Sequence, residues 1–149
     1  VTRRQRQMCI RDRGDAVMTP TRIYQKAGAI ALQTGGINGI VHVTGGGLME
    51  NPPRVYNDDL ALHIDCAARS LPPIFGWLRD QGAMEIQELA RTFNCGIGLL
   101  IFVDSKKSDD VLGALHNGPE PYAWIAGKLT NRNTNSAVVL DHSDSWMGL

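Results

Sequence analysis

The sequence predicts an α+β domain in which helices pack against a mixed β-sheet. Apolar residues recur at helical spacing in four segments, and short apolar or alternating runs predict strands between and after them. The predicted elements follow the order helix, strand, strand, helix, helix, strand, helix, strand, strand. Because this order does not repeat as βαβ units, it favours a mixed sheet over a wholly parallel one. The 149 residues give room for one domain with one core.

The first half of the chain predicts one helix followed by two strands. Thr19 and Pro20 are typical of a helix start, because a hydroxyl caps the first turn and proline suits the first helical position. The glycine pair at 35–36 stops this helix, and residues 39–44 are predicted as a short buried strand. Residues 60–66 alternate in polarity, which predicts the second strand. The expected inward-facing residues are Ile23, Ala27, Ile30 and Ala31 in the helix, and Leu60, Leu62 and Ile64 in the second strand.

The second half predicts three helices and three strands. In chain order these are helices at 74–81, 85–91 and 109–116, and strands at 96–103, 122–129 and 137–140. The run 96–103 is the most apolar segment, so it is expected to be a central strand. Ser105 and Ser108 are expected to cap the last helix. The last two strands are expected to form a hairpin through the polar loop 131–136.

Composition excludes several classes of protein. Fifteen basic and fifteen acidic residues cancel, whereas a nucleic-acid-binding protein usually carries a basic face, so no nucleic-acid partner is expected. No apolar run approaches the ~20 residues that span a bilayer, so no membrane partner is expected. The three cysteines are widely spaced and form neither a disulfide framework nor a metal-ligand pair. Together these features predict a cytoplasmic protein without a metal site.

The two ends of the chain differ from its middle. Residues 1–13 are basic and lack apolar periodicity, and part of this stretch resembles translated sequencing-adapter read-through. We interpret residues 1–13 as a non-native leader, with a basic nucleic-acid-binding arm as the alternative. The domain itself is expected to cover residues 14–141. Residues 142–149 are expected to form a tail in which only Trp146 packs.

A glycine-rich loop is the strongest candidate for a functional site. Thr44 follows the first predicted strand and leads into Gly45, Gly46 and Gly47, three residues that are free to adopt positive φ. Such a loop exposes backbone N–H groups that suit a phosphate or ribose phosphate, although a simple tight turn is the alternative. The Asn-Pro-Pro sequence at 51–53 prevents a long helix after the loop.

Polar residues near this loop are the other candidates. Glu50, Asn51 and Arg54 lie just past the glycines and could reach a ligand, or could simply form a solvated face. His42 is the candidate catalytic residue, because imidazole acts as acid or base near neutral pH. A lone histidine on a short apolar strand, however, more often has a structural, hydrogen-bonded role than a catalytic one. Cys95 could be a nucleophile, but no activating neighbour is present in the sequence, which favours a structural role.

Five segments in order resemble the C-terminal domain of aminoimidazole ribonucleotide synthetases. They are Pro20-Thr21-Arg22-Ile23-Tyr24, the stretch from His42 to Val55, Pro72 to Leu78, Arg91 to Gly98, and Tyr122 to Gly127. This resemblance spans residues ~15–141. The sequence departs from the family at Arg69, where a tryptophan is usual, and at Pro52, where an aliphatic residue is usual. The resemblance implies a three-layer α+β domain with helices flanking a mixed sheet.

The resemblance also implies a reaction and its participants. The family is an ATP-dependent cyclo-ligase that converts formylglycinamidine ribonucleotide to aminoimidazole ribonucleotide in purine biosynthesis. Its ATP and Mg2+ are bound mainly by an N-terminal domain, and no such segment is found here, so this chain alone is expected to be inactive. A homodimer is the expected assembly. The residues expected to line the substrate side of the cleft are Thr44, Gly45, Gly46, Gly47, Asn51, Arg54, Asn94 and Gly96.

Two alternatives stay open at the level of sequence. The first is a non-catalytic module that binds a ligand or partner through the same fold. The second is the matching domain of a related ATP-dependent enzyme, such as formylglycinamidine ribonucleotide synthase, selenophosphate synthetase or thiamine phosphate kinase.

Overall fold

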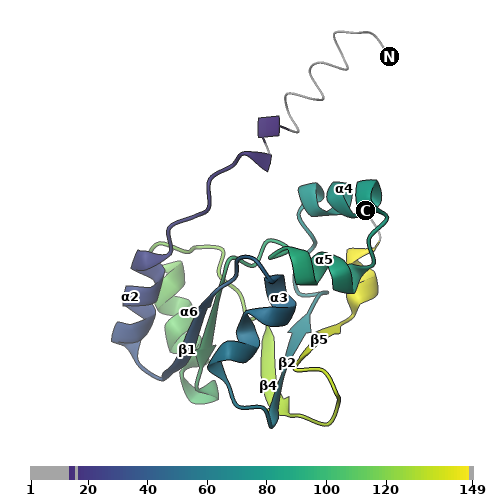
Figure 1. Cartoon of the computed structure of the whole chain (residues 1–149). Coiled ribbons are helices and arrows are strands. Elements are labelled where there is room, and N and C mark those ends of the chain that lie inside the picture. The colour runs from purple at the N-terminus through teal and green to yellow at the C-terminus, as the bar shows by residue number, and fades with distance from the viewer. Residues whose placement is uncertain (1–13, 16, 148–149) are drawn as a thin grey trace.

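A computed structural model describes residues 14, 15 and 17–147, which form the α+β fold that the sequence predicts (Figure 1). The longer helices are α2 (Gln25–Thr34), α4 (Pro73–Gly82), α5 (Ile86–Thr92) and α6 (Ser108–His116). The structure also has a four-residue helix, α3 (Gly47–Glu50), and the 3-10 helices η1 (Pro52–Val55), η2 (Ser105–Lys107) and η3 (Ser143–Trp146). The strands are β1 (Ile37–His42), β2 (Leu60–Asp65), β3 (Leu99–Val103), β4 (Gly127–Asn131) and β5 (Val138–Asp141). The predicted order of elements is confirmed.

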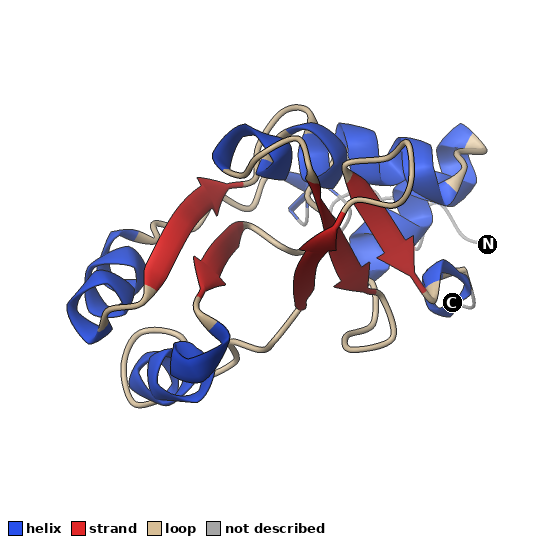
Figure 2. Cartoon of the chain, turned by 90° about the horizontal axis from the view of Figure 1, so that it is seen from below, coloured by secondary structure: helices blue, strands red, loops and turns tan. Residues whose placement is uncertain are grey.

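The strands form two sheets at the centre of the molecule, with helices around them (Figure 2). In the smaller sheet, β1 and β3 pair antiparallel. In the larger sheet, β2 lies between β4, which is antiparallel to it, and β5, which is parallel to it. The larger sheet is therefore mixed, as the element order indicated.

The predicted hairpin of the last two strands is wrong, because β4 and β5 pair with opposite edges of β2 rather than with each other. Arg132 holds the connecting loop around the start of β2. Its backbone N–H donates to the Asp59 carbonyl over 2.7 Å, and its guanidinium donates to the Asp58 carbonyl over 3.3 Å. This arrangement gives both edges of β2 a partner strand, which a β4–β5 hairpin would not do.

The helix predicted to start at Pro20 begins five residues later, as α2, so the predicted capping role of Thr19 is wrong. The Thr19 hydroxyl donates instead to the Asp15 carbonyl, and α2 begins at Gln25 without a side-chain cap. Contacts outside the helix decide this: Arg22 forms an ion pair with Glu120, and Tyr24 packs against His42 of β1 and against Gly98, just before β3. Ile23, expected inside, is 88% exposed. The predicted inner residues Ala27 and Ala31 and the stop at Gly35 are confirmed.

Three further local predictions need correction. The strand predicted at 96–103 begins at Leu99 and is half-buried rather than central, since within the described chain it pairs with β1 alone. The predicted capping by Ser105 and Ser108 is also wrong: no side chain caps α6, and the Asp104 carboxylate instead accepts the Lys106 backbone N–H at the start of η2. Of the strand predicted at 122–129, only the part from Gly127 belongs to a strand, which continues to Asn131.

The β1–β3 pair lies between two apolar clusters. On one side, Ala27, Ala31, Val111 and Leu115 of α2 and α6 pack against alternate residues of β3, namely Leu99, Ile101 and Val103. On the other side, Leu100 and Phe102 face the larger core that β2, α3 and α5 share. Both faces of β3 are thus apolar, which explains why its sequence reads as a continuous apolar run. Among the described residues, no helix has the length and apolar character needed to cross a membrane.

Candidate functional site

The glycine loop connects β1 to α3 and turns sharply, as the sequence predicts. The backbone of β1 continues through Val43, whose N–H donates to the Gly98 carbonyl over 2.9 Å. Gly46 and Gly47 then adopt positive φ, of 93° and 54°, and the Gly47 N–H donates back to the Thr44 carbonyl. Positive φ favours glycine, so the sequence permits this turn directly.

The buried Asn51 side chain holds the glycine loop in place. This side chain is only 3% exposed, although asparagine is usually found at the surface. Its Oδ1 accepts the Thr44 N–H over 2.7 Å, and its Nδ2 donates to the Gly45 carbonyl over 2.9 Å. Both polar groups of the side chain are therefore used to fix the loop. This geometry favours a supporting role for Asn51 over the direct ligand contact that we expected.

The three glycines play different parts. A Cβ on Gly47 would overlap the Ala90 carbonyl oxygen and lie 2.6 Å from that of Phe93, so this glycine allows α3 to pack on the end of α5. A Cβ on Gly45 would meet nothing within 4 Å. Gly45 is exposed and Gly46 half-buried, and neither residue's N–H donates a hydrogen bond within the described chain. The loop is thus open at Gly45, and at Gly46 the Glu50 side chain lies close by.

The predicted neighbouring turn at 94–98 does lie against the loop, through the contacts of Val43 with Gly98 and of Gly47 with Phe93. Asn94 shapes this turn, because its Oδ1 accepts the Gly96 N–H over 3.0 Å. Gly96 itself has a φ of 87° and packs against Pro72. The structure therefore places Asn94 and Gly96 as supports of the turn, and a ligand contact for either stays a prediction.

His42, Glu50 and Arg54 are exposed around the same loop. The His42 imidazole stands edge-on to the Tyr24 ring, with ring centroids 5.8 Å apart. Glu50 is the last residue of α3, and its side chain lies beside Gly46. The Arg54 guanidinium makes no hydrogen bond within the described chain. Catalysis by His42 and ligand binding by Thr44 and Arg54 stay predictions.

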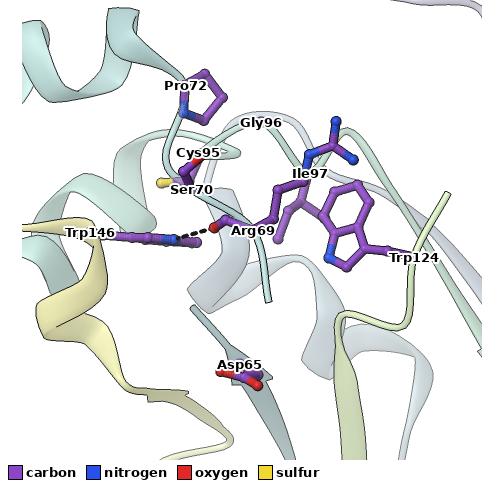
Figure 3. Close-up of a pocket in the computed structure, with 9 residues that line it drawn as sticks. All are labelled: Asp65, Arg69, Ser70, Pro72, Cys95, Gly96, Ile97, Trp124 and Trp146. Atoms are coloured by element: carbon purple, nitrogen blue, oxygen red, sulfur yellow. Dashed lines mark hydrogen bonds between the residues drawn. The ribbon is translucent and has the colours of Figure 1, made fainter. Parts of the chain in front are cut away.

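A small cavity opens beside the 94–98 turn, and Figure 3 shows the residues around it. Its volume of about 20 Å³ admits roughly one water molecule. The Arg69 guanidinium lies 4.4 Å from the Trp124 ring centroid, and the Trp146 indole N–H donates to the Arg69 carbonyl over 3.0 Å. Trp146 is 3% exposed, which confirms that it packs. Its partners were not predictable from sequence, because they lie far apart along the chain.

Cysteine and histidine chemistry at the site can be assessed from burial and distance. Burial raises the pKa of the Cys95 thiol to about 12, so it is a poor nucleophile at neutral pH. His63 and His142 each pair with one carboxylate, of Asp141 and Asp65 respectively. Within residues 14, 15 and 17–147, no three His, Cys, Asp or Glu side chains come together as a metal site requires.

Comparison with known proteins identifies the family. The model of the family described as "AIR synthase related protein, C-terminal domain" matches residues 3–140. The chain belongs to this family. The match includes most of residues 1–13, which lie outside the described residues, so the non-native leader stays a prediction. Residues 141–147 follow the match, yet they bring Trp146 into the core.

One curated relative is the human trifunctional purine biosynthetic protein adenosine-3. It is 37% identical to this family member over 126 residues, which are 85% of the chain and 12% of the human protein. The chain thus spans a small part of that relative's length.

Proposed function

We propose that this domain forms the substrate-side wall of an ATP-dependent cyclo-ligase that converts formylglycinamidine ribonucleotide to aminoimidazole ribonucleotide. Three findings support the proposal: membership of the AIR synthase related family, similarity to a human protein named for purine biosynthesis, and the form of the glycine loop. The sequences Thr92-Phe93-Asn94-Cys95-Gly96 and Glu50-Asn51-Pro52-Pro53-Arg54 favour the cyclo-ligase over its relatives.

The observation that carries the proposal is a rigid loop with an open outer side. Asn51 and Gly47 hold the loop from within, so its shape does not depend on a ligand. The N–H groups of Gly45 and Gly46 are left without partners in the described chain. Preformed backbone donors of this kind suit an anionic oxygen, and the ribonucleotide substrate carries a phosphate.

The role of this chain is to bind and orient the ribonucleotide. ATP supplies a phosphoryl group that turns the formyl oxygen into a leaving group, after which the amidine nitrogen attacks that carbon. Such transfers depend mainly on positioning and on stabilisation of charge. The family resemblance implies that ATP and Mg2+ bind mainly to a separate ATP-binding domain, and we assign them there. The purified chain alone should therefore show no turnover, and measurable turnover would contradict this assignment.

The decisive experiment joins this chain to the ATP-binding domain of a cyclo-ligase from the same family. Gly45→Met should raise KM for the ribonucleotide at least about tenfold while the melting temperature stays unchanged, because a side chain there meets no protein atom and projects from the open side. Gly113→Ala, on α6, is the matched control, since its Cβ also meets nothing within 4 Å. Unchanged KM and kcat in Gly45→Met would refute the role of the loop.

The same joined enzyme separates the related reactions. Activity with formylglycinamidine ribonucleotide and none with thiamine phosphate or selenide is the expected result. Activity with thiamine phosphate or selenide would instead assign the chain to a related enzyme with that activity. If no substrate turns over but a ribonucleotide still binds the chain, the domain is a binding module.

A further inference from the structure

Tyr24 stands beside the glycine loop although it precedes the loop by some twenty residues in sequence. Its ring contacts the exposed His42 imidazole, and its hydroxyl lies over Gly98 so closely that a Cβ on Gly98 would overlap it. The Gly98 carbonyl accepts the Val43 N–H, and Val43 directly precedes Thr44. In Figure 1 the chain enters α2 at the end of the molecule where β1 leads toward α3. Tyr24 therefore contacts His42 and Gly98, two residues that adjoin the start of the loop.

The position of Tyr24 is fixed from both sides. On its N-terminal side, the Arg22 guanidinium donates to both carboxylate oxygens of Glu120, over 3.0 and 2.9 Å, and lies 5.6 Å from the Tyr24 ring centroid. On its C-terminal side, α2 starts at once, and the Tyr24 carbonyl accepts the Gly28 N–H over 2.9 Å. A ring held in this way adds little ordering cost to any contact it makes.

The Tyr24 hydroxyl has no hydrogen-bond partner among the residues that the structure describes. This contrasts with Tyr56, whose hydroxyl donates to the Ala137 carbonyl over 2.7 Å. Tyr24 is half-buried, and burial raises the pKa of its phenol, so the hydroxyl stays protonated and able to donate at neutral pH. A half-buried donor without a protein partner, beside a loop that offers two further donors, indicates a shared acceptor.

We propose that the Tyr24 hydroxyl is part of the ribonucleotide site and donates a hydrogen bond to a phosphate or ribose oxygen of the ligand held against residues 44–47. This inference rests on the proposed function and deepens it, because it extends the substrate-side wall from the loop to the segment before α2. Sequence alone did not assign Tyr24 a role, since the contact with the loop exists only in the fold.

The test is titration of the whole chain with formylglycinamidine ribonucleotide, followed by amide chemical shifts of the glycine loop. Tyr24→Phe keeps the ring on His42 and Gly98 and removes only the hydroxyl. It should bind the ribonucleotide about tenfold more weakly, which is the usual effect of losing one hydrogen bond to a charged or polar ligand group. Tyr122→Phe is the matched control, because Tyr122 is 75% exposed, and its dissociation constant should stay within twofold of the wild type.

A second variant tests the inference without depending on Tyr24→Phe alone. Gly98→Ala forces the Tyr24 hydroxyl to move, so this variant should also bind the ribonucleotide more weakly. If Tyr24→Phe is already present, Gly98→Ala should weaken ribonucleotide binding by a smaller factor. Equal dissociation constants for wild type and Tyr24→Phe would overturn the inference and leave the proposed function intact. If the wild-type chain shows no saturable shift at millimolar ribonucleotide, both the proposed function and this inference fail.

Discussion

Replacing Asn51 with alanine should destabilise the chain by about 2 kcal/mol. The substitution removes two hydrogen bonds, of 2.7 Å to the Thr44 N–H and 2.9 Å to the Gly45 carbonyl, from a side chain that is 3% exposed. At about 0.5–1.5 kcal/mol each, the two bonds contribute about 1–3 kcal/mol. The middle of this range applies because Thr44 and Gly45 are exposed, so water can partly replace the lost partners.

Urea denaturation at pH 7 measures this loss as a lower midpoint with an unchanged slope. Asn133→Ala is the matched control, since Asn133 is exposed and should change the free energy of unfolding by less than about 0.5 kcal/mol. An Asn51→Ala loss below the same threshold would refute the view that Asn51 holds the loop.

Asn51→Asp sharpens the argument, because aspartate keeps an acceptor for Thr44 but loses the donor to Gly45. At neutral pH a buried carboxylate would face a carbonyl oxygen, so this variant should be at least as unstable as Asn51→Ala. Burial and the carbonyl should raise the folded pKa of that carboxyl above its unfolded value. The variant should therefore regain stability relative to wild type as pH falls through the raised pKa, and a constant difference from pH 3 to 7 would contradict this account.

Three further predictions follow from the same structure. Gly47→Ala should cost roughly 3 kcal/mol or more in urea denaturation, because alanine would have a strained φ of 54° and overlap the Ala90 carbonyl; a loss under about 1 kcal/mol would contradict the packing. Burial raises the pKa of the Cys66 and Cys95 thiols to about 12, so peptide mass spectrometry should find neither labelled by iodoacetamide at pH 8 until urea is added. The Asp65 carboxylate raises the pKa of His142 above 6.5, and His142 lowers that of Asp65 below 3.8. The pair should therefore stabilise the fold fully between about pH 4 and 6.5 and lose its effect as pH rises through the raised pKa of His142. His142→Gln should reduce this pH dependence, and an unchanged pH profile would argue against it.

Local signals in the sequence predicted most of the elements. Pro72-Pro73 and Gly82 mark the ends of α4, and the spacing of Ile86, Leu89 and Ala90 gave the buried face of α5 correctly. In each of these cases the determining residues are neighbours in the chain. The positive φ of Gly46 and Gly47 was predictable for the same reason.

The errors arose where distant residues decide the local structure. Thr19 has the chemistry of a helix cap, but contacts of Arg22 and Tyr24 with remote segments delay the helix to Gln25. The polar loop after β4 looks like a hairpin loop, yet Arg132 ties it to the turn before β2. No pattern within a window of ten or so residues carries such information.

In the candidate site, too, contacts between distant residues were not predictable from sequence. The structure separates residues that support the loop from residues that face outward, whereas the sequence placed both in one predicted site. Asn51, Gly47 and Gly96 face inward or pack against backbone and proline, so substitutions there should act first on folding. Thr44 and Gly45 lie on the open side, so substitutions there should act on a ligand and leave the free energy of unfolding almost unchanged. A run of three glycines could be a simple turn, but a simple turn does not require a buried asparagine to hold it with two hydrogen bonds. The two hydrogen bonds from buried Asn51 are therefore a stronger reason than the glycine run itself to regard this surface as a binding site.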